Sequence, residues 1–101
     1  MVSMPDVFHA LDDETRRLIL DELAAKDGQT LFELCGTLLM RHGLSSSRQA
    51  ISQHLAVLEA AGLVHTQRQG RTKLHHFDPT PLAEISRRWP LAQHPTRKDP
   101  S

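Results

Sequence analysis

One stretch of this chain decides its fold: SSRQAISQHLAVLEAAGLVHTQRQGRTKLHHF, residues 46–77. The first half predicts a helix over about residues 47–61, because its apolar side chains recur every three or four positions. On a helix of about 3.6 residues per turn, Ile51, Leu55 and Leu58 fall on one side and form a stripe that faces a core. The helix is therefore amphipathic, and its other side is free for another task.

Both ends of this helix are marked in the sequence. Ser46-Ser47-Arg48-Gln49 has the pattern of a capping box, in which a hydroxyl caps the first turn and a Gln side chain bonds back to it. Gly62 follows the last apolar position and predicts the C-terminal stop, because glycine adopts a left-handed backbone at low cost.

The outward side of the same helix carries no Asp, Glu or Lys. Its residues are small or carry amides: Gln49, Ser52, Gln53, Ala56 and Ala60. Gln and Ser can donate to and accept from base edges, and alanine leaves room for the floor of a groove. Arg48, in the first turn, can reach a phosphate or a guanine. The pattern favours a helix that reads the major groove of DNA, and the alternative is a polar face that meets only water.

The second half of the stretch predicts a β-hairpin. Residues 63–64 and 74–77 are largely apolar and flank a polar centre at Gln69-Gly70. Three cations surround this turn: Arg68, Arg71 and Lys73. Such a tip predicts a wing that holds phosphates, and an arginine there could enter a narrow minor groove. The alternative is an exposed hairpin that its charges keep soluble.

The rest of the chain adds helices on both sides of this unit. Two short helices are predicted at the ends, Val7–Leu11 and Leu82–Trp89. Between them, one helix is predicted from the acidic residues 12–14 to a left-handed cap at Gly28. Another is predicted from Leu31 to about Met40, behind a capping box of Thr30 and Glu33. The predicted fold is mainly α with a small β-hairpin, a winged helix-turn-helix with added terminal helices. Residues 1–90 are expected to form one DNA-binding domain, and residues 91–101 a mobile tail.

The 101 residues suit a single small domain, and their formal net charge is zero. The charge is nevertheless segregated, because residues 1–40 hold three basic and eight acidic side chains, whereas residues 41–101 hold nine basic and four acidic ones. A neutral chain can thus present one basic face to phosphates. We expect a cytoplasmic protein with no membrane partner, because the sequence has no apolar run of about 20 residues and no secretory signal pattern.

The chain resembles the ArsR/SmtB-type bacterial repressors over about residues 5–90. The likeness is carried by Ala10-Leu11-Asp12 with Thr15-Arg16, by Ile19-Leu20 and Leu23, by the run from Ser47 to Leu55, by Leu58 and residues 61–64, and by the wing turn Arg68-Gln69-Gly70-Arg71. One departure is the stretch between Leu34 and Ser47, which is longer than is usual in the family, so the third helix is extended or followed by a longer turn.

The resemblance implies a homodimer that binds a palindromic operator and represses transcription. It implies that Val7–Leu11 and Leu82–Trp89 form the dimer contact. It also implies that a set of recognition-helix residues faces DNA: Ser47, Arg48, Gln49, Ser52, Gln53 and His54. Of these, His54 falls beside the core stripe on the helical wheel, so its position favours a base contact less than the positions of the others do.

Many relatives in this family sense metals, but the sequence offers no complete site. Cys35 is followed by Gly36-Thr37, so a thiolate pair is missing, and the last helix offers only Glu84. The adjacent His75-His76 point to opposite faces of a strand and cannot form one site. We therefore predict no metal and no other cofactor.

Three alternatives to a DNA-binding regulator follow from the sequence. Cys35 lies among leucines, so we expect it to be a core residue, and the alternative is a redox switch. The winged helix could instead be a protein-docking module that binds no DNA, and a metal-responsive switch is the third reading. An enzyme is not predicted, because no phosphate loop, nucleophile elbow or carboxylate pair beside a histidine is found.

Overall fold

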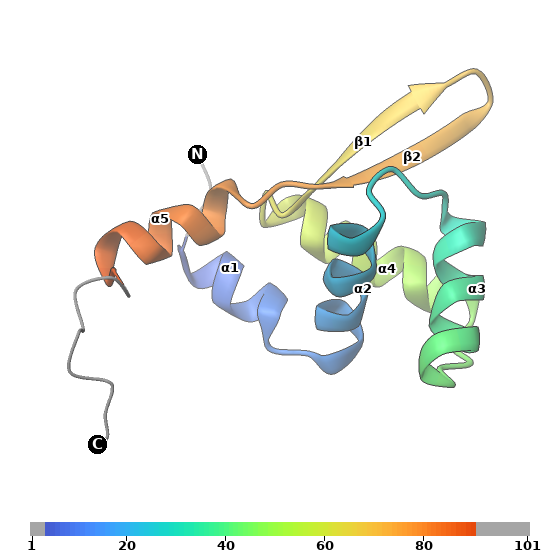
Figure 1. Ribbon diagram of the computed structural model, residues 1–101, viewed down its shortest axis with the longest axis horizontal. Helices are drawn as coiled ribbons and strands as arrows, with labels where there is room; N and C mark the ends of the chain where they lie inside the picture. Colours follow the sequence, from blue (N-terminus) through green and yellow to red (C-terminus); the bar gives the residue numbers. More distant parts are fainter. Residues whose placement is uncertain (1–3, 91–101) are drawn as a thin grey trace.

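The computed structural model describes residues 4–90, which form five helices and one two-stranded antiparallel sheet (Figure 1). In chain order the elements are α1 (Met4–Leu11), α2 (Glu14–Ala25), α3 (Leu31–His42), α4 (Arg48–Ala60), β1 (Val64–Gln69), β2 (Thr72–Phe77) and α5 (Thr80–Arg88). The predicted order and the predicted winged helix-turn-helix class are confirmed. The tail expected at 91–101 lies outside the described residues.

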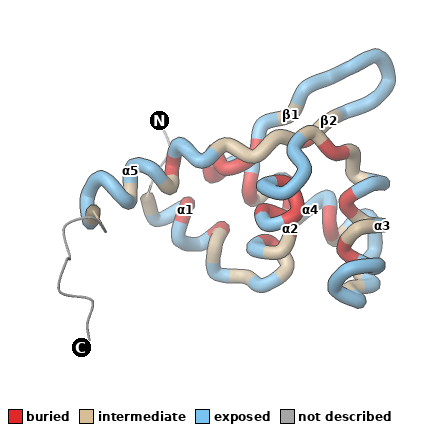
Figure 2. The backbone as a smooth tube through the Cα atoms, viewed as in Figure 1, coloured by how far each residue is buried: buried red, intermediate tan, exposed pale blue. Residues whose placement is uncertain are grey.

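The core forms where the helices cross one another and the base of the hairpin, while the hairpin tip is exposed (Figure 2). The predicted stripe of α4 is confirmed, because Ile51, Leu55 and Leu58 are all buried. Leu63 and Val64 extend this core from the end of α4 into β1, and both are fully buried. The apolar stripe thus fixes which side of α4 faces outward.

The ends of α3 follow local sequence signals. At its start, the Glu33 backbone N–H donates to the Thr30 hydroxyl over 3.1 Å, and the Thr30 N–H donates to the Glu33 carboxylate over 2.9 Å, so the predicted capping box is confirmed. At its end, Gly43 adopts a left-handed φ of 65°. The helix runs to His42, two residues beyond the prediction, and this extension absorbs part of the longer stretch before α4.

The predicted role of Gly28 as the helix cap of α2 is wrong. The helix ends at Ala25, and Lys26 is its C-cap. Gly28 does have a positive φ of 75°, but its N–H donates to the carbonyl of His75 in β2 over 3.0 Å. This glycine therefore turns the chain toward the hairpin, where Gln29 forms an isolated bridge with His75.

The arrangement separates three parts of the molecule (Figure 1). The terminal helices α1 and α5 lie together at one end, and α3 lies at the other. The hairpin projects away from the helices, and α4 runs through the middle with its N-terminus near α3. No helix within residues 4–90 is long and apolar enough to cross a membrane.

Candidate nucleic-acid interface

The outward face of α4 is available for a partner. Its predicted members are all exposed: Gln49, Ser52, Gln53, Ala56 and Ala60. None of them takes part in a side-chain hydrogen bond within residues 4–90. The amides and hydroxyl on this face are therefore free to bond with base edges.

The start of α4 differs from its prediction by one residue. The Ala50 backbone N–H donates to the Ser47 hydroxyl over 3.0 Å, so Ser47 is the N-cap and the helix begins at Arg48. The predicted capping box from Ser46 to Gln49 is wrong, because the residue three positions after the true cap is Ala50, which has no side chain to bond back. This shift leaves Gln49 free on the outward face.

His54 lies on a different side of α4 from the exposed amides. Its side chain is only 25% exposed, and its Nδ1 lies 3.2 Å from Nη1 of Arg16 and 3.9 Å from a carboxylate oxygen of Asp13. The structure thus places His54 against α2, whereas the other members of the predicted set lie on exposed positions of α4 or at its cap.

The wing is a regular hairpin whose turn lies one residue later than predicted. Gln69 pairs with Thr72, so the turn residues are Gly70 and Arg71, and the predicted centre at Gln69-Gly70 shifts accordingly. Gly70 has a φ of 66°, which the tight turn requires and glycine adopts most easily. The three predicted cations are all exposed and form no ion pair within the described residues: Arg68, Arg71 and Lys73.

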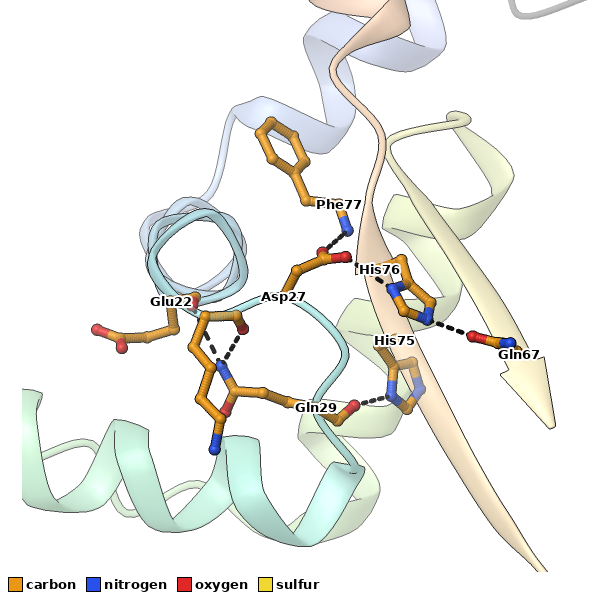
Figure 3. Close-up of polar contacts among 8 residues, drawn as sticks. Glu22, Asp27, Gln29, Gln67, His75, His76 and Phe77 are labelled. Atoms are coloured by element: carbon orange, nitrogen blue, oxygen red, sulfur yellow. Dashed lines mark hydrogen bonds and ion pairs between the residues drawn. The ribbon is translucent and has the colours of Figure 1, made fainter. Parts of the chain in front are cut away.

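Asp27, in the loop between α2 and α3, ties the wing to the helices (Figure 3). One carboxylate oxygen accepts from the Phe77 backbone N–H over 2.7 Å, and the other accepts from Nδ1 of His76 over 2.7 Å. Burial alone would raise the pKa of Asp27, but the hydrogen bonds from His76 and Phe77 outweigh it and hold that pKa below its ordinary value. The other ring nitrogen of His76 lies 2.8 Å from Oε1 of Gln67 in β1.

Gln29 makes a second tie on the buried side of β2. Its side-chain amide donates to the carbonyls of Lys26 and Glu22 at the end of α2, and the Glu22 carbonyl also accepts from the Lys26 N–H. Its own carbonyl accepts from both the backbone and the ring of His75. His75 and His76 therefore face opposite sides of the strand, as predicted. The sequence prediction did not identify Asp27 or Gln29, because no local pattern marks a contact with a distant strand.

The recognition helix and the wing meet at an open cleft of about 420 Å³. The N-terminus of α3 forms its third wall through Thr30. The polar and cationic side chains of α4 and the wing that line it include Arg48, Ser52, Arg71 and Lys73. Three cations from α4 and the wing thus converge beside the outward face of α4, and such a group can attract phosphates.

Cys35 packs partly against the core on α3. Burial raises the pKa of its thiol, although the positive charge of Arg48 acts in the opposite direction. A thiol with a raised pKa is a weak nucleophile at neutral pH. Within residues 4–90, no group of three or more His, Cys, Asp or Glu side chains could hold a metal ion.

Comparisons with known proteins match most of this chain. A family model described as a helix-turn-helix domain matches residues 11–67. The uncharacterized HTH-type transcriptional regulator YuzN of Bacillus subtilis (strain 168) is 47% identical over 82% of this chain and 90% of that protein. The HTH-type transcriptional regulator Rv2034 of Mycobacterium tuberculosis (strain H37Rv) is 39% identical over 80% of this chain and 70% of that protein. Among solved structures, an ArsR-like transcriptional regulator from Rhodococcus sp. RHA1 is 38% identical over 84% of this chain and 74% of that one, with a TM-score of 0.68.

Proposed function

Because this chain belongs to the ArsR family of helix-turn-helix transcriptional regulators, we propose that it binds operator DNA as a homodimer and represses transcription. One observation carries the proposal: the uncharged outward face of α4 lies beside a cleft lined by cations from α4 and the wing. This role needs binding and no chemical step, so we propose neither an enzymatic activity nor a cofactor. The site of action is the cytoplasm, where operator DNA lies.

The proposed interface divides into two groups of residues. Base edges in the major groove are read by Gln49, Ser52 and Gln53, which are exposed and uncharged. Phosphates are held by Arg48, Arg68, Arg71 and Lys73. Ser47 can donate its hydroxyl hydrogen to a phosphate, because its oxygen is the part that accepts from Ala50. His54, the remaining predicted contact, lies on the side of α4 that packs against α2, so it supports the position of the helix.

The proposed dimer contact is formed by α1 and α5. These helices pack together at one end of the molecule and leave large apolar side chains in solvent, with Phe8 46% and Trp89 55% exposed. Leu82 and Ile85 add half-buried apolar surface on α5. A two-fold axis through this end would give two recognition helices related by symmetry, and such a dimer matches a palindromic operator.

The proposal is tested by selecting duplexes from a randomised pool and measuring affinity for the selected duplex and a scrambled one. Gln53→Ala should lower the preference for the selected duplex by about thirtyfold or more, because each of the two half-sites loses a glutamine contact that supplies roughly 1–3 kcal/mol of discrimination. The slope of affinity against salt should stay the same for this variant.

Arg71→Ala should have the opposite signature. It should weaken binding to both duplexes alike and reduce the salt slope by about 1.8, because each of the two wings loses one phosphate contact. The matched control is Arg17→Ala, which removes an exposed arginine from α2, outside both the wing and the proposed dimer helices, and should leave the slope unchanged. A wild-type protein that prefers no duplex over the scrambled one at moderate salt would refute DNA reading and favour a protein-docking role.

A further inference from the structure

Arg16 is a buried arginine of α2, only 9% exposed, whose side chain touches two other helices. Its Nε donates to the carbonyl of Ala10 over 2.8 Å, and its Nη2 donates to the carbonyl of His9 over 3.0 Å. Both carbonyls belong to the last turn of α1, and the carbonyl of His9 also accepts from the Asp12 N–H. The remaining nitrogen, Nη1, lies 3.2 Å from Nδ1 of His54 in α4.

The chemistry of this contact fixes the state of the histidine. A guanidinium group can only donate hydrogen bonds, so Nδ1 of His54 must accept and the imidazole must be neutral with its hydrogen on Nε2. The planar guanidinium then spans α1 and α4 with three donors in one rigid fork. A contact of this kind holds the two helices in one relative position.

We propose that Arg16 and His54 are positioning residues, which fix recognition helix α4 relative to terminal helix α1 and thereby set the spacing of the two recognition helices. This inference rests on the proposed function, in which α1 lies at the dimer contact and α4 enters the groove. The joint does not touch DNA. It acts by determining which separation of half-sites both helices can reach at once.

The test measures spacing preference on the duplex selected by the wild-type protein. Inserting one base pair between the half-sites moves one of them by about 3.4 Å and rotates it by roughly 35°, and should weaken wild-type binding by about tenfold or more. His54→Leu removes the acceptor, and Arg16→Met removes all three donors. Both should reduce this penalty to about threefold or less, because a lost hydrogen bond to a charged group frees α4 to adjust.

Arg17→Met is the matched control. Arg17 neighbours Arg16 and also donates to α1, to the Leu11 carbonyl over 2.7 Å, but it is exposed and forms no hydrogen bond with α4. This variant should keep the wild-type spacing penalty. Because Arg16→Met removes a buried side chain and could fail to fold, His54→Leu decides the test, with its unfolding midpoint in urea measured in parallel.

A conservative variant adds a readout that a merely structural role would not move. His54→Asn places a side-chain oxygen near the position of Nδ1, so it can still accept from Arg16 and should keep the wild-type spacing penalty.

The outcomes separate the two proposals. A wild-type protein that selects no duplex refutes the proposed function. If wild-type binding shows no spacing penalty, or if His54→Leu keeps the full penalty while folded, the joint is refuted and the proposed function stands. A penalty lost in His54→Leu but kept in both Arg17→Met and His54→Asn supports the joint.

Discussion

Removing the carboxylate of Asp27 should loosen the wing from the helices. The variant Asp27→Ala deletes the acceptor for the Phe77 N–H and for His76, two hydrogen bonds of 2.7 Å each. Hydrogen bonds to a charged group contribute roughly 1.5–3 kcal/mol each, but the Asp27 side chain is 52% exposed and water replaces part of each bond. We therefore expect the free energy of unfolding to fall by about 1–2 kcal/mol in total.

The pH dependence of this loss has a definite sign. The folded state holds the pKa of Asp27 below its ordinary value, so the stabilisation is complete above the ordinary aspartate pKa, about 3.9, and disappears as the pH falls through the folded value. The difference between wild type and Asp27→Ala should thus be full at pH 7 and shrink toward zero near pH 2.

Urea unfolding at both pH values measures the effect, and hydrogen exchange of the β2 amides shows where it acts. Asp21→Ala is the matched control, because Asp21 is an exposed carboxylate of α2 with no side-chain hydrogen bond or ion pair within residues 4–90. If Asp27→Ala costs no more than Asp21→Ala at pH 7, or if its cost is unchanged at low pH, the carboxylate is not the tie described above.

Three further changes test the recognition helix and its surroundings. Ser47→Ala should cost about 1 kcal/mol of stability in urea unfolding, whereas Ser46→Ala should cost almost nothing, and the reverse result would restore the cap to Ser46. Leu58→Ala should cost roughly 2–5 kcal/mol because the side chain is fully buried, and the half-exposed Leu39→Ala should cost much less in the same assay. Gly28→Ala should lower the thermal midpoint, because φ is +75° there and a Cβ would lie 3.1 Å from the adjacent imidazole; an unchanged midpoint would contradict this account.

The sequence predicts the parts of the fold that depend on neighbours along the chain. The stripe of Ile51, Leu55 and Leu58, the capping box at Thr30 and the hairpin were all predicted from residues within a few positions of one another. The helix cap was predicted one residue too early at Ser46, because Ser46 and Ser47 offer the same hydroxyl and a local pattern cannot choose between them. The order of elements was predictable for the same reason.

Contacts between distant residues were not predictable. Asp27 and His76 are 49 positions apart, and Arg16 and His54 are 38 apart, so no spacing rule connects either pair. The wheel placed His54 beside the core stripe, which is consistent with its position against α2, but it could not supply the partner. These residues are found only when folding brings α2 beside the wing and α4.

The structure also explains how a chain of zero net charge can present a cationic face. Several acidic side chains of the first half are used inside the fold: Asp13 caps α2, Glu22 pairs with Arg41 and His42, Asp27 holds the wing, and Glu33 caps α3. Hydrogen bonds hold the pKa values of Asp13, Asp27 and Glu33 below their ordinary values, so these carboxylates stay charged and engaged at neutral pH. The cations around the cleft form no ion pair within the described residues. The field at the proposed interface therefore depends on where the fold places each charge, and the cleft presents cations that are unpaired within residues 4–90 although the chain as a whole is neutral.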